Sequence, residues 1–406
     1  MEQSLITLID TIRSARANSS PLRIRGGGSK DFYGEPFDPG LPVLDTRSHS
    51  GIVSYEPSEL VITVKAGTPL AQVEAVLAEK NQCFPFEPPH YKSHPTSGGK
   101  PDAHATIGGM VAAGLSGPAR AVAGSVRDYV LGAHLINGKG ELLQFGGTVM
   151  KNVAGYDVSR LLAGSMGTLG LITQVSLKVL PMAPREATLR FFMQEAVMIQ
   201  AVNEWAGQPL PINASSWVLD PAVDHGHGTL YLRLRGAVAA VESACKMFVE
   251  KHGAVRVDAP TTTADWSAAR DLKLPWFEGG FAGSDGAELK DKAQSRDLWR
   301  ISVAPTTPPL NLGDTMIDWL GGQRWVFSDA TDVQAAQRIR IAAHAANGIA
   351  TKFIAHDADS IWANGQKSLK IKHLSELDAT VAGIHRRLKH EFDPAGIFNP
   401  GRLGVI

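Results

Sequence analysis

The sequence is poor in cysteine and has no long hydrophobic run. Its 406 residues include only two cysteines, Cys83 and Cys245, which cannot form a disulfide framework or supply the four thiolates of an iron–sulfur cluster. No stretch approaches the roughly 18 consecutive apolar residues that indicate a membrane-spanning helix. The N-terminus carries Glu2 where a signal peptide carries basic residues. We therefore expect a cytoplasmic protein.

An excess of charge of either sign is also absent. Forty basic residues balance forty acidic ones, so the composition gives no argument for binding nucleic acid or an anionic membrane surface. The hydrophobic content of 44% and the charged content of 20% are ordinary for a globular protein. At about 100–200 residues per domain, the length indicates two or three domains.

The standard phosphate-binding fingerprints are missing. No G-x-G-x-x-G occurs, and neither Gly99-Lys100 nor Gly138-Lys139 is followed by Ser or Thr as a Walker motif requires. These absences exclude a Rossmann dinucleotide site and a P-loop. A nucleotide, if bound, has to be held in some other way.

Several glycine-rich elements are spread over about the first 180 residues instead. Three consecutive glycines, Gly26 to Gly28, lie between Arg25 and Lys30, and bare peptide N–H groups flanked by positive charge suit a pyrophosphate. A flexible surface turn is the alternative for such a triplet. Further glycines allow something to approach the backbone closely, and they stand at positions 108, 109, 164, 167 and 170. Together these elements predict a nucleotide-like ligand larger than a mononucleotide.

Local signals predict where several helices and turns begin. Thr68 is expected to cap a helix that starts at the following proline, and Thr106 is expected to cap a second one. Asn137-Gly138 indicates a type I′ turn between two strands of a hairpin. Asp157 or Ser159 can cap a short helix that is followed by a strand-rich run up to residue 179.

Taken in order, these elements resemble the FAD-binding domain of the vanillyl-alcohol oxidase and p-cresol methylhydroxylase family. The resemblance covers residues 1–181 and rests on Arg25 to Lys30, Thr106 to Gly109, Lys151 to Asp157, and Gly167 to Thr173. It implies an α+β fold, in which a two-part FAD-binding domain of the p-cresol methylhydroxylase type precedes an α+β cap domain with a mostly antiparallel sheet. We expect the cap over 182–372, and a C-terminal helix and tail over 373–406 that return to the first domain.

Finer features resemble the E-subunit family of bacterial glycolate oxidases, the FAD-binding subunits of those enzymes. They are Glu87 to Tyr91, Gly124 to Gly132, Leu298 to Ser302, and Phe398 to Arg402. This second resemblance extends over most of the chain. It implies that the chain acts together with other subunits.

The resemblance also implies which residues contact FAD. The pyrophosphate is expected at Arg25, Gly26, Gly27, Gly28, Ser29 and Lys30; the same groove is expected to be lined by Thr106, Ile107, Gly108 and Gly109; the adenine end is expected at Gly167, Thr168, Gly170, Leu171 and Ile172; and the flavin ring is expected near Glu87 and Pro88. Some relatives attach FAD covalently through a histidine where this chain has Ser29, which implies dissociable FAD. Many relatives also have a glutamate where this chain has Met166, so any role of that acid is missing.

Arg300 is the candidate catalytic residue. Oxidation of a 2-hydroxy acid requires a flavin near the α-carbon, a base for the hydroxyl proton and a cation for the carboxylate. Arg300 follows Trp299 in a predicted strand, and an arginine can grip a carboxylate with two hydrogen bonds. The alternative for this residue is a structural ion pair.

No metal site is expected. Related D-2-hydroxy-acid dehydrogenases carry a His-x-Gly-Asp-x-Asn-x-His motif, which Asp224-His225-Gly226-His227 matches only superficially. We interpret this segment as a loop. Three histidines of one loop-rich stretch are more typical of side chains that hydrogen-bond to backbone; they are His90, His94 and His104.

The electrons that reach a flavin must leave it again, and the chain has neither a cysteine cluster nor a nicotinamide fingerprint. The resemblance implies a complex with a catalytic FAD-binding D subunit and an iron–sulfur F subunit, which places the chain peripherally at the inner membrane. Our leading hypothesis is the FAD-binding subunit of a glycolate dehydrogenase complex, with D-lactate as a second candidate substrate. The alternatives are a self-sufficient flavin-dependent 2-hydroxy-acid dehydrogenase and a flavin-free structural subunit.

Overall fold

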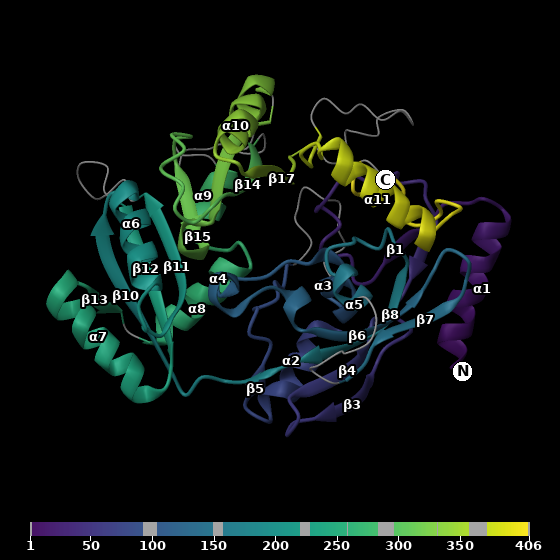
Figure 1. The fold of residues 1–406 in the computed structure, drawn as a ribbon, viewed down its shortest axis with the longest axis horizontal. Helices are drawn as coiled ribbons and strands as arrows, with labels where there is room; N and C mark the ends of the chain where they lie inside the picture. Colours follow the sequence, from purple (N-terminus) through teal and green to yellow (C-terminus); the bar gives the residue numbers. More distant parts are fainter. Residues whose placement is uncertain are drawn as a thin grey trace. The chain divides into compact units, whose positions relative to one another are not determined.

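The chain folds into two compact units. The computed structural model describes residues 2–91, 104–148, 157–219, 228–257, 259–282, 296–330, 332–356 and 372–404. The first unit comprises Met1–Leu115, Ser125–Pro181 and Ala358–Ile406, and the second comprises Ser116–Gly124 and Met182–Asp357 (Figure 1). This division differs from the expected ranges in two places. Residues 116–124 belong to the second unit, and the chain returns to the first unit at residue 358 instead of 373.

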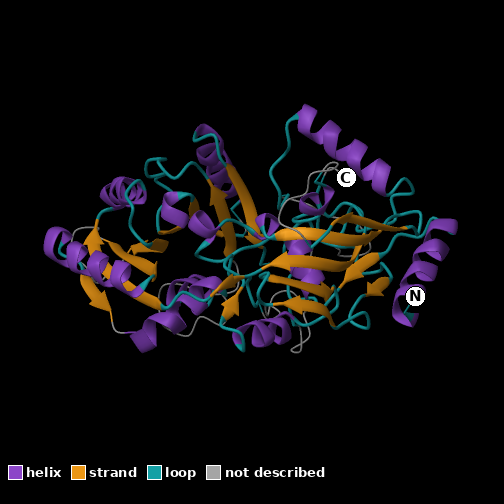
Figure 2. Ribbon diagram, turned by 60° about the horizontal axis from the view of Figure 1, so that its bottom comes forward, coloured by secondary structure: helices purple, strands orange, loops and turns teal. Residues whose placement is uncertain are grey.

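The first unit is built on a five-stranded sheet in the order β3-β4-β8-β6-β7, in which all neighbouring strands are antiparallel (Figure 2). One face buries aliphatic side chains such as Ile62, Leu135 and Val175, and helices α2 and α3 pack onto the same core. The bounds are β3 Ile52–Glu56, β4 Val61–Lys65, α2 Leu70–Ala78, α3 Ile107–Ala113, β6 Val130–Ile136, β7 Leu142–Gly146 and β8 Leu171–Lys178.

A second, smaller core of this unit joins the two ends of the chain. Leu8 and Ile12 of the N-terminal helix α1 pack with Leu22, Ile397 and Phe398, so the C-terminal tail lies against the start of the chain. The first unit is therefore itself in two parts. Its remaining elements are α1 Gln3–Ala17, β1 Arg23–Arg25, β2 Val43–Asp45, β5 Gln82–Cys83, η2 Val126–Asp128, α5 Val158–Leu161, β9 Leu180–Pro181 and α11 Ala379–Phe392. Strand β1 pairs parallel with β2, and β5 pairs with β9.

The second unit contains an eight-stranded sheet in the order β13-β10-β12-β11-β15-β16-β14-β17. Every pair of neighbours is antiparallel, which confirms the antiparallel sheet expected for the cap. The strands are β10 Arg185–Met193, β11 Ile212–Leu219, β12 Gly228–Gly236, β13 Val255–Val257, β14 Arg296–Ser302, β15 Thr315–Asp318, β16 Gln323–Asp329 and β17 Ile349–Ile354. The helices are α4 Arg120–Ala123, α6 Glu195–Ala206, α7 Val238–His252, α8 Ala259–Arg270, α9 Pro275–Ala282, η4 Trp319–Gly321 and α10 Val333–Ala345.

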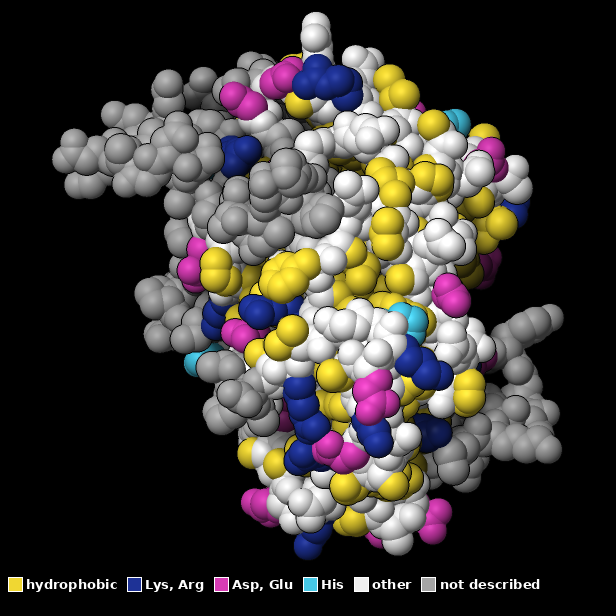
Figure 3. All heavy atoms as spheres, turned by 90° about the vertical axis from the view of Figure 1, so that its left-hand side faces the viewer, with side chains coloured by type: hydrophobic (Ala, Val, Ile, Leu, Met, Phe, Trp, Pro, Cys, Tyr) yellow, Lys and Arg dark blue, Asp and Glu magenta, His cyan; other side chains and the backbone are white. Residues whose placement is uncertain are grey.

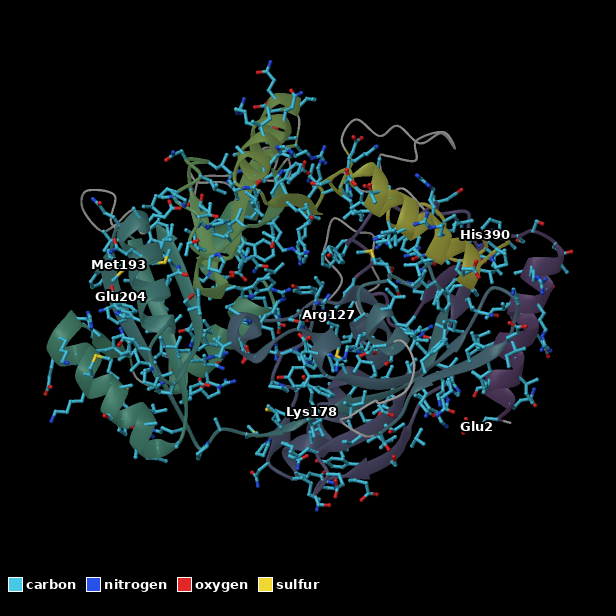
Figure 4. All side chains as sticks on the ribbon, viewed as in Figure 1. Glu2, Arg127, Lys178, Met193, Glu204 and His390 are labelled. Atoms are coloured by element: carbon cyan, nitrogen blue, oxygen red, sulfur yellow. The ribbon has the colours of Figure 1, made fainter. Side chains whose placement is uncertain are left out.

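Helices α6 and α7 supply the apolar face that packs on one half of this sheet. Trp205 of α6 and Phe248 of α7 pack edge to face with ring centroids 4.9 Å apart, and both are buried. Figure 4 labels Met193, where strand β10 ends, and Glu204, which lies near the end of α6.

On the face shown in Figure 3, basic and acidic side chains are interspersed, as the balanced composition predicts. In the part of the chain that the structure describes, no helix is long and apolar enough to cross a membrane.

Two of the four predicted caps and turns are confirmed and two are wrong. Thr106 accepts a hydrogen bond from the Gly109 amide at 3.3 Å, and Asp157 accepts one from the Arg160 amide. The Thr68 hydroxyl instead donates to the Lys65 carbonyl at 2.7 Å, and α2 begins without a side-chain cap. The Asn137 side chain accepts bonds from two later amides of the hairpin loop, which lengthens the loop beyond a two-residue type I′ turn.

A buried carboxyl group at the end of β15 makes the stability of the second unit depend on pH. Asp318 is 7% exposed, and it accepts a hydrogen bond from the Trp325 indole at 2.9 Å. Burial raises the pKa of Asp318 to about 6 from 3.8, against the opposing effect of its hydrogen bonds. The folded state therefore holds this proton more tightly than the unfolded chain does.

We predict that the wild type loses stability as the pH rises and that the Asp318→Asn variant lacks this loss. Below its unfolded pKa the protonated Asp318 stabilises the fold, and the contribution is lost as the pH rises through about 6, a change of up to about 3 kcal/mol. Urea unfolding at a series of pH values, followed by tryptophan fluorescence, measures this change, since seven of the eight tryptophans belong to the second unit. Identical pH profiles for wild type and variant would contradict this assignment.

Candidate functional site

Two adjoining clefts in the first unit form a continuous groove. Six residues line both clefts, which makes them parts of one surface: Ile24, Gly26, Gly109, Ala112, Met166 and Asn399. The walls of the groove come from the loop after β1, from helix α3, from the turn before β8 and from the C-terminal tail.

The loop after β1 presents unpaired backbone donors to the first cleft. Residues Gly26 to Lys30 all line this cleft. Within the described part of the chain, the amides of Gly26, Gly27, Gly28 and Ser29 donate to no acceptor. Gly28 has a φ of +76°, a conformation that glycine adopts without strain. Successive free amides in a turn form a concave site for an anion such as a phosphate.

The glycines of this loop are required first by the packing of the protein itself. A Cβ atom on Gly26 would lie 2.3 Å from the Thr106 hydroxyl, and one on Gly27 would lie 1.6 Å from the His104 carbonyl oxygen. The fold itself therefore requires glycine at these two positions, whatever the loop binds. Gly109 is different, because a Cβ atom there would meet only the Thr106 hydroxyl at 3.1 Å.

The charges that flank the loop are used mainly to hold it. The guanidinium groups of Arg23 and Arg25 both pair with Asp31, at 2.6 and 2.8 Å. The Lys30 ammonium donates to the Ser29 hydroxyl at 3.4 Å and to the Pro89 carbonyl at 3.3 Å. The loop is thus fixed in shape by its own ion pairs, and its binding capacity for an anion comes chiefly from the amides.

Helix α3 contributes a wall of small residues to the groove. Its first amides are already bonded, since Ile107 N–H donates to the Thr68 carbonyl and Gly108 N–H donates to the Ala66 carbonyl. Thr106, Gly108 and Gly109 line the groove together with Ala112. Ile107 is fully buried in the core and lines neither cleft.

The turn before β8 lines the second cleft, which is the more apolar one. Gly167, Gly170, Leu171 and Ile172 all border it. Their expected contact with the adenine end stays a prediction. Thr168 lies behind the surface, because it is completely buried and its hydroxyl donates to the Ser165 carbonyl.

Glu87 and Pro88 line neither of the two clefts. Glu87 takes a left-handed conformation with a φ of 49°, and Pro88 is buried. The neighbouring Pro89 is tied to the glycine loop by the hydrogen bond from Lys30. Their expected position near a flavin ring stays a prediction.

Arg300 lies in the second unit on strand β14. Its guanidinium carbon lies 5.0 Å from the centre of the Phe353 ring, and it lines neither cleft of the groove. Its role as a carboxylate clamp stays a prediction.

His90 pairs with Glu74 at 2.6 Å, and the described residues contain no cluster of three or more metal-ligating side chains. Three groups of interest lie outside the described residues: Lys151 to Tyr156, Asp224 to His227, and His94.

Several groove residues could not be identified from the sequence. Tyr33 and Phe37 line the first cleft and Thr46 and Ala66 line the second, and no motif marks them. Asn399 and Arg402 also line the groove. Both belong to the C-terminal motif Phe398 to Arg402. This motif supports the family resemblance, but it does not by itself indicate that its residues line a groove.

Known proteins resemble the chain in sequence and in fold. Residues 3–146 match the FAD binding domain family. The chain is 39% identical over 399 residues to glycolate oxidase subunit GlcE of Escherichia coli, covering 98% of this chain and 96% of the relative. It is 31% identical to glycolate oxidase subunit GlcD of Bacillus subtilis, over 94% of this chain and 83% of the relative. D-2-hydroxyglutarate dehydrogenase of Xanthomonas citri is 24% identical over 97% and 86% of the two chains.

Among solved structures, an alkyldihydroxyacetonephosphate synthase superposes with a TM-score of 0.65 over 97% of this chain and 74% of its own. The sequence identity is 14%, so this likeness concerns the fold alone. The two-part first unit and the antiparallel second unit agree with the α+β fold that the sequence analysis predicted.

We predict that Gly109→Leu removes flavin binding without unfolding the first unit. A Cβ atom there meets only the Thr106 hydroxyl, at 3.1 Å, and the position lines both clefts, so the leucine side chain should lower FAD affinity at least about tenfold. Fluorescence titration with FAD and circular dichroism of the apoprotein measure the two effects. The matched control is Gly383→Ala on α11, where no neighbour lies within 4 Å. Unchanged FAD affinity in the leucine variant would contradict the assignment of the groove.

Proposed function

The chain belongs to the FAD-binding oxidoreductase family that includes glycolate oxidase subunits GlcE and GlcD, and from this membership we propose that it is the FAD-binding subunit of a glycolate dehydrogenase complex. The similarity to GlcE over nearly the whole of both chains carries this proposal. The complex would oxidise glycolate to the 2-oxo acid glyoxylate, with D-lactate as a second substrate. As in the sequence analysis, the other members would be a catalytic D subunit and an iron–sulfur F subunit.

The residues of the groove fit FAD. Four unpaired amides, Gly26 to Ser29, offer donors for the pyrophosphate oxygens. The small residues of α3 leave room for a flat ring system beside them, and the backbone of Leu171 and Ile172 borders the apolar end. Bound FAD supplies a two-electron acceptor for the α-carbon of a 2-hydroxy acid.

The groove itself holds few groups that could remove the substrate proton. Among the described residues that line it, the only carboxylate is Asp31, and none is a histidine. The Asp31 carboxylate is ion-paired with Arg23 and Arg25, so it is already engaged in holding the loop. This favours a division of labour in which the D subunit carries out the substrate chemistry and the flavin of this chain passes electrons on.

The destination of the electrons lies outside this chain. Its two cysteines are Cys83 and Cys245, which are too few to hold an iron–sulfur cluster. We therefore place the next electron carrier in the F subunit. The complex would hold the chain peripherally at the inner membrane through its partners.

A self-sufficient 2-hydroxy-acid dehydrogenase is the second candidate. The near full-length similarity to D-2-hydroxyglutarate dehydrogenase favours it, because that relative is named for a complete reaction. In this case Arg300 is the proposed cation for the substrate carboxylate. A flavin-free structural subunit is the third hypothesis, which the matched FAD binding domain family disfavours.

We predict that the flavin of the isolated chain is not reduced by substrate alone. Under anaerobic conditions, glycolate or D-lactate should leave its absorbance unchanged until the D subunit is added, because the described groove lacks an available base. The spectrum of the visible flavin bands measures this directly. Rapid bleaching of the isolated chain would instead establish the self-sufficient enzyme. Arg300→Met would then be compared with Arg386→Met on α11 for loss of substrate affinity.

We also predict that the FAD is dissociable. Ser29 occupies the position where some relatives carry the histidine that binds FAD covalently, and a hydroxyl cannot form that histidyl bond. The Ser29 side chain is buried and accepts a hydrogen bond from Lys30. Acid precipitation of the yellow protein should leave all flavin in the supernatant, as measured by absorbance. A precipitate that stays yellow after washing would contradict the prediction.

A further inference from the structure

The C-terminal tail bridges two walls of the groove through one side chain. Asn399 lines both clefts. Its side-chain oxygen accepts a hydrogen bond from the Ile24 amide at 2.8 Å, and its side-chain nitrogen donates to the Met166 carbonyl at 2.6 Å. Ile24 immediately precedes the glycine loop region, whereas Met166 begins the turn before β8. A single amide group therefore connects the anion-binding end with the apolar end.

Arg402 fixes the glycine loop from its C-terminal side. Its guanidinium donates to the carbonyl oxygens of Lys30, Asp31 and Glu35, and it stacks on Phe37 at 3.9 Å. Burial lowers the pKa of Arg402 to about 9, which still leaves the group charged at neutral pH. The guanidinium group of Arg402 thus donates to three carbonyl oxygens at the end of the loop. The unpaired amides lie earlier in the same loop.

Lys389 of helix α11 ties the tail to the same turn. Its ammonium group donates to the carbonyl oxygens of Thr168 and Phe398, both at 2.8 Å, and to the Asp393 carboxylate at 2.6 Å. These three bonds use all of its donors. The Asp393 oxygens also accept from the amides of Ile397 and Phe398. These bonds therefore fix the start of the tail, which directly precedes Asn399 at the groove.

The bond between Asn399 and Met166 joins two residues in an uncommon conformation. Asn399 has a φ of 41° and Met166 has a φ of 50°, the left-handed region that side chains other than glycine rarely adopt. Such conformations persist where the surroundings impose them, and they are frequent at ligand sites. Met166 and Gly167 are the central residues of a tight turn, which the hydrogen bond from the Thr168 amide to the Ser165 carbonyl closes at 3.0 Å. The contact holds both backbones in the positions that give the groove its walls.

We propose that the tail from Ile397 to Arg402 is a clasp that sets the width of the groove, so that docking of the tail and binding of FAD stabilise each other. This inference rests on the proposed binding of FAD and goes beyond it. Asn399 and Arg402 are positioning residues, which act through the glycine loop and the turn before β8. Because linkage is reciprocal, a tail that strengthens FAD binding must itself be strengthened by FAD.

Hydrogen exchange of the full-length chain with and without FAD tests the reciprocal effect. FAD should slow exchange of the amides of Phe398, Asn399 and Arg402, whose acceptors are Asp393, the Leu22 carbonyl and the Asn399 carbonyl. Strand β12 of the second unit serves as the internal reference. Slower exchange in residues 24–30 and 165–172 without any change in residues 397–404 would overturn the clasp. No FAD binding by the wild type would instead overturn the proposed function, so the two failures are distinguishable.

Substitutions test the direct effect. Asn399→Ala should weaken FAD binding at least about tenfold in a fluorescence titration, and should shrink the rise in melting temperature that saturating FAD produces. Arg402→Lys keeps the charge but loses the fork, so it should bind FAD more weakly than wild type and more tightly than Arg402→Met. The matched control is Arg387→Ala, an exposed arginine of α11, which should behave as wild type. Wild-type FAD affinity in the Asn399 and Arg402 variants would overturn the proposal, and the exchange experiment decides it if these variants do not fold.

Discussion

The candidate site depends most on a short loop in which four backbone amides have no acceptor among the residues that the structure describes. Successive backbone N–H groups in a turn offer several donors to one anion. Here the amides of Gly26 to Ser29 face a groove, while the other side of the loop is packed against His104 and Thr106. The ion pairs of Arg25 with Asp31 and the bonds of Arg402 hold the ends. This arrangement leaves the loop no freedom to turn its donors inward.

Four segments far apart in the sequence form the groove. They are the loop after β1, helix α3, the turn before β8 and the C-terminal tail. Each contributes backbone or small side chains, which explains why a dinucleotide can be held without the single fingerprint loop of a Rossmann domain. The tail shares a small core with the N-terminal helix through Phe398. The first and last parts of the chain therefore have to fold together before the groove is complete.

The sequence predicts those features of this site that depend on contacts within a few residues. It does not predict the features that depend on contacts between distant segments. The caps by Thr106 and Asp157 follow from side chains that act within three residues, and the glycine triplet marks the anion-binding loop. The sequence could not show that Gly27 is required by the His104 carbonyl, or that Asp31 neutralises the flanking arginines. Thr68 was misjudged because its hydroxyl finds the Lys65 carbonyl instead of an α2 amide. No local pattern in the sequence indicates that residues 116–124 belong to the second unit.

The central claim is that backbone amides bind the pyrophosphate of FAD, and a comparison of FAD with riboflavin in calorimetric titrations of the apoprotein tests it most directly. Riboflavin carries the same ring system but lacks both the pyrophosphate and the adenosine. If two or more charge-assisted hydrogen bonds form at about 1.5–3 kcal/mol each, FAD should bind at least about a hundredfold more tightly than riboflavin. Equal affinities of the two ligands would contradict the account, because the amides of Gly26 to Ser29 would then contribute nothing to recognition.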